Sequence, residues 1–152
     1  MTGIAAVESS YMQFRTFTLF GRRDRWPNES YDGGSHIGLM QVPTDMRNAW
    51  SWLANTQTGV RIFRQKISTA KRKERQIIND FKKKNPDIKI KDIEKLTGIQ
   101  IENMALVLYG EHASSGLDKQ YYILCKENER GVWKENSEVN AKGVAYAKKV
   151  RL

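Results

Sequence analysis

Glu8 is the residue in this sequence best placed to donate a proton. It directly follows the apolar segment 4–7, IAAV, and is itself followed by Ser9 and Ser10. This pattern predicts a helix over residues 2–10 that ends beside the carboxyl group. Burial disfavours an ionised carboxyl, and the negative end of a helix acts in the same direction. A carboxyl group in this position could keep its proton near neutral pH and serve as a general acid, although most glutamates are solvated surface groups.

Four further motifs follow Glu8 along the chain. After ESS at 8–10 come GLMQV at 38–42, NTQTGVRIF at 55–63, ALVLYG at 105–110 and GVAYAKKV at 143–150. In this order they resemble the goose-type lysozyme and soluble lytic transglycosylase superfamily over nearly the whole chain. The resemblance implies an N-acetylmuramidase that hydrolyses the β-1,4 bond between N-acetylmuramic acid and N-acetylglucosamine in peptidoglycan. Glu8 would protonate the leaving oxygen, as a glycosidase acid does.

An inverting hydrolase also needs a second carboxylate, roughly 6.5–9.5 Å from the acid, to activate water. The candidates are Glu29, Asp32 and Asp45. The resemblance favours Asp32, which stands six residues before Gly38. The family also has an aspartate directly after GLMQV, but here Pro43 follows and Asp45 lies two residues further on. Asp32 could instead be a turn residue before glycine, and Asp45 could be a helix cap.

Lytic transglycosylases resemble the same pattern but lack the base. In them the C6 hydroxyl of the sugar attacks, and a 1,6-anhydro product forms. Two carboxylates close behind Glu8 favour hydrolysis over this alternative.

Several residues are candidates for contacting sugar. We expect GLMQV to form a cleft wall in which Gln41 hydrogen-bonds N-acetyl groups and Met40 packs on a sugar face; the alternative is a buried strand that Gln41 caps. His36 would line the cleft or belong to a loop. The resemblance assigns Tyr109 and Tyr146 to the cleft, although the asparagine that follows the first tyrosine in the family is glycine here. Three tryptophans would stack on sugars or pack in the core: Trp50, Trp52 and Trp133.

The elements that must position these residues are mostly helical. Apolar residues at steps of three and four predict a long helix over 55–84, which the sequence NPD at 85–87 ends. Shorter helices are expected over 99–111 and 139–150. Short strands are expected near 35–42, and a hairpin over 121–133 with its turn near 128–131. The expected fold is mainly α, a lysozyme-like α+β fold with a small irregular β region next to the cleft.

Charge restricts the partners. The 152 residues hold 26 Lys and Arg against 17 Asp and Glu, a net charge of +9. This balance favours an anionic partner such as a wall polymer. KRKER at 71–75 and KKK at 82–84 leave a nucleic-acid-binding module as a remote alternative. No helix-turn-helix, zinc-finger or RNP motif supports it, so we expect no nucleic acid partner. A wall-binding domain without activity is a third possibility.

The remaining composition narrows the class of protein. The length suits a single domain over 1–152, which we expect to be part of a longer protein. No apolar run is long enough for a membrane span, no signal peptide is evident, and neither a metal nor another cofactor is expected. We expect a monomer that acts in the periplasm or on the wall of a target bacterium. It would be an antibacterial domain of a type VI secretion effector, a phage tail or an endolysin, and an immunity protein would be a partner of a secreted toxin.

Overall fold

A computed structural model describes residues 2–30, 33–110, 121–136 and 141–151. Within them the chain mixes helices with small two-stranded sheets, and helix prevails. The chain divides into two compact units. Unit 1 comprises Met1–Ile62 with Lys149–Leu152, and unit 2 comprises Phe63–Lys148.

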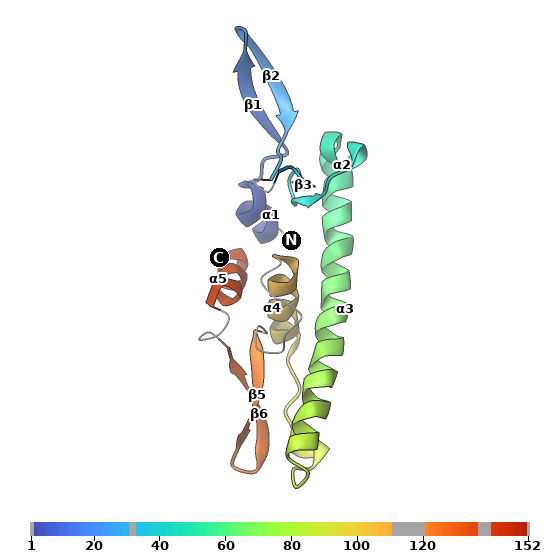
Figure 1. Ribbon diagram of the computed structural model, residues 1–152, viewed down its shortest axis with the longest axis vertical. Coiled ribbons are helices and arrows are strands. Elements are labelled where there is room, and N and C mark those ends of the chain that lie inside the picture. The colour runs from blue at the N-terminus through green and yellow to red at the C-terminus, as the bar shows by residue number, and fades with distance from the viewer. Residues whose placement is uncertain (1, 31–32, 111–120, 137–140, 152) are drawn as a thin grey trace. The chain divides into compact units, whose positions relative to one another are not determined.

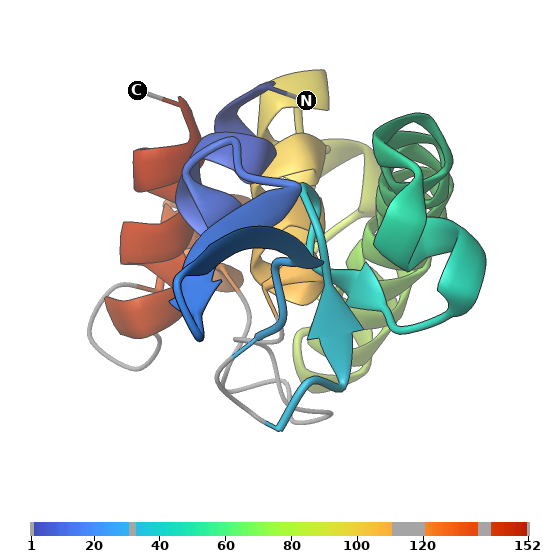
Figure 2. The ribbon, with the colours of Figure 1, turned by 90° about the horizontal axis from the view of Figure 1, so that it is seen from above.

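Unit 1 combines short helices with two small antiparallel sheets (Figure 1). Its elements are α1 (Thr2–Ser9), β1 (Phe14–Leu19), β2 (Arg22–Pro27), β3 (His36–Ile37), β4 (Val42–Pro43), α2 (Met46–Trp50) and the first turns of α3 (Trp52–Lys84). Strands β1 and β2 pair from Phe14 opposite Pro27 to Leu19 opposite Arg22. Figure 2 looks onto this hairpin and shows that its ribbon is curved.

Helix α1 ends at Ser9, one residue after Glu8, because the next two residues turn the chain out of the helix. Ser10 and Tyr11 have positive φ angles of 52° and 62°. Their backbone N–H groups donate to the carbonyls of Ala6 and Ala5, at 3.1 Å each, so the end of the helix keeps its hydrogen bonds. Left-handed backbone is costly for residues other than glycine, and such strain concentrates at functional sites.

Unit 2 is built around an apolar cluster. It contains the rest of α3, the short 3-10 helix η1 (Ile90–Asp92), α4 (Gly98–Tyr109), the hairpin β5 (Tyr122–Glu127) and β6 (Arg130–Glu135), and α5 (Ala141–Arg151) up to Lys148. Phe81, Ile88 and Ile93 form one buried cluster, with Ile78 and Leu124 packed against it. Gly131 of β6 allows close contact, because a Cβ there would lie 3.1 Å from side-chain atoms of Ile93 and Phe81.

The helix boundaries in unit 2 follow local sequence signals. Helix α3 ends before Asn85, whose side-chain Nδ2 donates to the Phe81 carbonyl at 2.9 Å. Helix α4 begins with a capping box, in which Thr97 and Gln100 each accept a hydrogen bond from the other's backbone N–H. These two signals explain why the expected helices over 55–84 and 99–111 are confirmed to within a few residues.

The other predicted helices and strands are also present in the structure, which adds one hairpin that was not predicted. The helix that ends near Ser10, the hairpin over 121–133 and the short strands near 35–42 are confirmed. The last helix is confirmed from Ala141, and the start expected at 139 lies outside the described residues. The hairpin over 14–27 was not predicted.

Candidate functional site

The end of α1 that carries Glu8 is held beside the GLMQ segment by Ser9. Ser9 is buried, and its hydroxyl lies 2.7 Å from the Leu39 carbonyl oxygen and 3.0 Å from the Ala5 carbonyl oxygen, so its one proton can be donated to either. The first contact joins the C-terminal end of α1 to the turn between β3 and β4. Glu8 itself is partly buried and makes interactions of its own within the structure. The two motifs ESS and GLMQ, 30 residues apart in sequence, therefore meet in unit 1.

Two buried amide side chains hold the backbone of this turn. The Oε1 atom of Gln13 accepts from the Leu39 N–H at 2.9 Å, and the Oδ1 atom of Asn55 accepts from the Met40 N–H at 2.8 Å. The Nδ2 atom of Asn55 donates to the Ile37 carbonyl at 2.7 Å. Because each amide pairs both its oxygen and its nitrogen, the turn is fixed on both sides.

Buried amide side chains also bind the segments next to this turn. Gln13 Nε2 donates to the carbonyls of Asn48 and Ala49, at 3.0 and 2.9 Å. Asn28 accepts from the Gly38 N–H through its own carbonyl at 2.8 Å, while its Nδ2 donates to Met12. We define the amide clamp as four buried residues: Gln13, Asn28, Asn48 and Asn55.

Sequence reasoning missed the amide clamp entirely. Asparagine and glutamine are mostly exposed in proteins, so a buried set is informative once it is seen. One signal was present, because Asn55 opens the NTQTGVRIF motif and precedes the apolar stripe of α3. Single residues of this type are otherwise indistinguishable from surface polar groups.

Gly38 is the residue on which the turn depends most. Its φ is +79°, and a Cβ atom at this position would lie 2.4 Å from Asn55 Nδ2 and 2.6 Å from Gln13 Oε1. Both the backbone conformation and the space around it therefore require glycine.

Gln41 and Met40 are placed differently from the expectation. Met40 is only 1% exposed, and it packs against Gly59 of α3, where an added Cβ would lie 2.7 Å from the Met40 Cβ. The expectation that Met40 packs on a sugar face is therefore wrong for this structure. Gln41 donates from Nε2 to the carbonyls of Asn28 and Gly38, at 3.0 and 2.9 Å. Both of its N–H groups serve the turn, so towards an N-acetyl group it can offer only its oxygen.

The candidate second carboxylates have different surroundings. Asp45 caps α2: its Oδ1 accepts from the Asn48 N–H at 2.7 Å and its Oδ2 from Asn48 Nδ2 at 2.6 Å. The capping alternative for Asp45 is thereby confirmed, and its role as a base stays a prediction. Asp32 lies outside the described residues. Glu29 is exposed, and its Oε1 accepts from Trp26 Nε1 at 3.1 Å.

Aromatic side chains gather at the base of the β1–β2 hairpin. The ring of Trp50 lies 5.8 Å from that of Trp26, edge to face, and 6.1 Å from that of Phe14. Both tryptophans are half exposed, as stacking on a ligand requires. A hollow beside them is lined by Arg15, Thr16, Phe17, Trp26, Pro27 and Glu29.

The other predicted aromatic and histidine residues are spread over the two units. His36 lies on β3, and its Nδ1 is 3.0 Å from the Ser35 hydroxyl. In unit 2, Tyr109 packs edge to face against Phe63 at 6.3 Å, and Tyr146 is buried on α5. Trp52 is exposed, whereas Trp133 is buried with its Nε1 donating to the Glu94 carbonyl at 2.8 Å.

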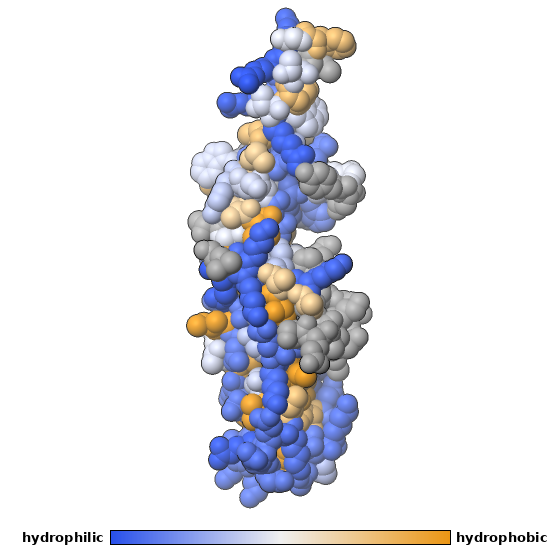
Figure 3. Space-filling view, turned by 90° about the vertical axis from the view of Figure 1, so that its left-hand side faces the viewer, coloured by the Kyte–Doolittle hydropathy of each residue, from blue (hydrophilic) through white to orange (hydrophobic). Residues whose placement is uncertain are grey.

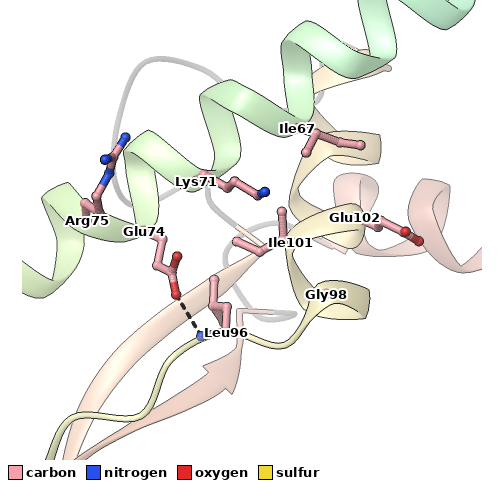
Figure 4. A pocket seen from close by; sticks show the side chains of 8 residues that line it. All are labelled: Ile67, Lys71, Glu74, Arg75, Leu96, Gly98, Ile101 and Glu102. Atoms are coloured by element: carbon pink, nitrogen blue, oxygen red, sulfur yellow. Dashed lines mark hydrogen bonds between the residues drawn. The ribbon is translucent and has the colours of Figure 1, made fainter. Parts of the chain in front are cut away.

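Unit 2 carries a groove of mixed charge between α3 and α4. Figure 4 shows the side chain of Lys71 pointing into it, with Glu102 on the α4 side. The side chain of Glu74 is engaged, since its Oε1 accepts from the Leu96 N–H at 2.8 Å. Along the same helix, burial and the neighbouring Arg72 lower the pKa of Lys73. With cations and carboxylates both present, the groove does not select for one charge.

Comparison of the chain with models of protein families, with curated proteins and with solved structures finds no match. Among the residues that the structure describes, no group of three or more His, Cys, Asp or Glu side chains could hold one metal ion. None of the described helices combines the length and the apolar character needed to cross a bilayer.

Proposed function

We propose that this chain is an N-acetylmuramidase of lysozyme-like fold, which cuts the glycan strands of peptidoglycan with Glu8 as the general acid. The observation that carries the proposal is the tether from Ser9 to Leu39, which brings the Glu8 end of α1 to the GLMQ turn. If the two motifs resembled the family only by chance, they would have no reason to lie side by side. The net charge of +9 suits an anionic wall polymer.

The chemistry required of Glu8 fits its position at the end of α1. The last carbonyls of a helix create negative potential, which favours the protonated form of a nearby carboxyl. From that form, Glu8 would protonate the glycosidic oxygen as the bond to the sugar breaks. The rigid turn beside it would keep donor and substrate in register, because the amide clamp leaves the backbone of residues 37–40 little freedom.

The second step of the reaction separates two versions of the proposal. In the hydrolytic version a carboxylate activates water, and Asp32 is the first candidate because Asp45 is engaged in capping α2. In the alternative, a lytic transglycosylase, the substrate's own C6 hydroxyl attacks and no base is needed. The capping role of Asp45 removes one argument for hydrolysis, so the product must decide.

The test uses purified peptidoglycan and mass analysis of the fragments released. We expect the wild-type chain to release fragments with a reducing end, which carry one added water, whereas 1,6-anhydro ends would establish the alternative. Glu8→Gln should lower the rate by about 10²-fold or more, the usual contribution of a general acid. Glu94→Gln removes one exposed carboxylate of unit 2 and should leave the rate unchanged.

Two further variants address the base. Asp32→Asn should abolish hydrolysis, while Asp45→Asn, which retains a side-chain acceptor for the cap, should keep most of the rate. A Glu8→Gln protein that releases fragments as fast as wild type would refute the proposal. Binding of peptidoglycan without any release by the wild-type chain would favour an inactive wall-binding domain.

We also propose the setting of this activity. The chain would act on the wall of a target bacterium as an antibacterial domain, and a protein that fills the substrate cleft would serve as its inhibitor. Protection of bacteria by a co-expressed candidate inhibitor would test this, with the Glu8→Gln chain as the non-toxic control.

A further inference from the structure

The β1–β2 hairpin is exposed beyond its base, at every residue whose burial the structure describes. Every side chain described between Arg15 and Trp26 is exposed to solvent, and only the base of the hairpin, at Phe14 and Pro27, is more buried. An isolated two-stranded ribbon is at best marginally stable in water. A ribbon of this kind that is kept as an arm suggests a contact surface.

The tip of the hairpin carries an unusual residue. Strands β1 and β2 are joined by Phe20 and Gly21, with φ angles of 49° and 76°, as in a tight type I′ turn. Asparagine, aspartate or glycine ordinarily occupies the first of these positions, since a bulky residue is strained at positive φ. Phe20 is nevertheless there, and 97% of its surface is exposed.

Phe20 is therefore disfavoured twice in the free protein, by its backbone and by the exposure of its ring to water. Both costs are tolerated where a side chain serves a function. Burial of the ring against an apolar phase would recover the second cost.

The residues around Phe20 identify the kind of phase. Four arginines against one aspartate leave three net positive charges on residues 14–27, and Arg22 and Arg23 directly follow the turn. Figure 3 shows hydrophilic and hydrophobic side chains together over the outer end of the hairpin. Guanidinium groups bind phosphate oxygens through paired hydrogen bonds. An apolar point surrounded by arginines matches a bilayer surface, where acyl chains lie just beneath phosphate groups.

We propose that the hairpin tip docks on membranes that contain anionic lipid, with Phe20 inserted at the boundary between headgroups and acyl chains and with Arg22 and Arg23 on lipid phosphates. This is peripheral binding by a hairpin. A strand-binding groove for nucleic acid would place its aromatic platforms along a basic track. Phe17 and Trp26 are also exposed on the hairpin, but the most exposed ring, that of Phe20, lies at the tip. The inference does not depend on the proposed function.

The experiment measures partitioning onto vesicles of phosphatidylcholine alone and of phosphatidylcholine with phosphatidylglycerol, at ~0.15 M salt. We expect binding to the anionic vesicles only. Phe20→Asn restores the residue that a type I′ turn prefers, so the hairpin should remain folded. Partitioning should nevertheless weaken by about tenfold or more, the value of one buried aromatic ring.

Matched variants separate local from general effects. Arg22→Gln with Arg23→Gln should weaken partitioning by about fivefold per arginine. Lys83→Gln with Lys84→Gln removes the same charge from the end of α3 and should change it little. Ile90→Gln removes another exposed apolar side chain and should also have little effect.

The outcomes are distinct from those of the peptidoglycan assay because no cleavage is measured. Equal binding by wild type and Phe20→Asn would overturn the proposal. So would an absence of binding to anionic vesicles, which would point to a protein or nucleic acid partner instead. Equal losses in the arginine and lysine pairs would reduce the effect to net charge and would equally refute a role for the tip.

Discussion

The GLMQ turn of unit 1 and the apolar cluster of unit 2 are two ways of holding a chain in place. The turn is held by buried amides, each hydrogen-bonded to particular backbone groups. The cluster of Phe81, Ile88 and Ile93 is held by apolar contact. Apolar packing is non-directional and tolerates changes of shape, whereas buried hydrogen bonds demand one geometry and are costly when half made. The hydrogen-bonded amides fix the position of the GLMQ turn, whereas the apolar cluster stabilises unit 2.

The largest expected loss of stability comes from Gly38→Ala in the GLMQ turn. The added methyl group would collide with Asn55 and Gln13 in a backbone conformation that alanine disfavours. We expect a loss of about 3 kcal/mol or more in the free energy of unfolding. Hydrogen exchange followed by mass spectrometry should show the loss of protection in unit 1. A variant with wild-type thermal stability would contradict the clamp described here.

A pair of volume-changing substitutions compares the two solutions directly. Asn55→Leu leaves the Met40 N–H and the Ile37 carbonyl without their partners, and should cost about 2–4 kcal/mol. Ile88→Val removes one methylene from the cluster and should cost about 0.5–1.5 kcal/mol. Urea unfolding of both proteins gives the two values. Equal costs would mean that the amides contribute no more than apolar packing.

Ser9→Ala tests whether the tether positions Glu8. The change leaves the Leu39 carbonyl without the Ser9 hydroxyl and should lower stability by about 1 kcal/mol. If the tether holds the acid in register, the maximal rate of peptidoglycan cleavage should fall further than stability alone explains. Ser9→Thr retains a hydroxyl and should restore part of the rate. A loss of stability with an unchanged rate would give Ser9 a purely structural role.

The smallest expected effect is on the pH dependence of stability, through Tyr121 in unit 2. Burial, together with the nearby Glu135 and the neighbouring Tyr122, whose ring is tilted against that of Tyr121, raises the pKa of Tyr121. The folded state thus holds the phenol proton more tightly than the unfolded state, whose tyrosine titrates near pH 10. The stabilisation of the folded state by the protonated Tyr121 is complete below about pH 10 and is lost as the pH rises above that value. Tyr121→Phe should flatten the fall in stability between neutral and strongly alkaline pH, as measured by denaturant unfolding at each pH.

The parts of the fold that the sequence predicts are those with local signals. The apolar stripe and the NPD stop define α3, and apolar composition defines α4. The β1–β2 hairpin was not predicted, because its turn residues are Phe20 and Gly21 and its second strand is rich in arginine. In addition, neither strand shows a buried face among the residues whose burial is described. A hairpin without a core face lacks the alternation of apolar and polar residues from which strands are recognised.

The candidate site shows the same limit more sharply. The Ser9 hydroxyl joins the end of α1 to the GLMQ turn, but the side chains that hold the turn itself are amides far apart in sequence. Asp45 and Met40 also illustrate why residue type is insufficient. A cap before α2 uses the carboxylate of Asp45, and a glycine in α3 opens the space that Met40 fills. Both facts depend on tertiary contacts that a linear pattern does not contain.

Gly3 links the order of synthesis to the completion of unit 1. A Cβ atom at Gly3 would lie 1.7 Å from the Val150 carbonyl oxygen, so α1 rests against the last turn of α5. Unit 1 is thus discontinuous, with residues 63–148 translated between its two segments. On the ribosome, the helix that carries Glu8 must wait until residues 63–148 have been made before its neighbour at Val150 emerges. A nascent chain that is released early would lack this neighbour, and the timing of translation would itself delay assembly of the acid's surroundings.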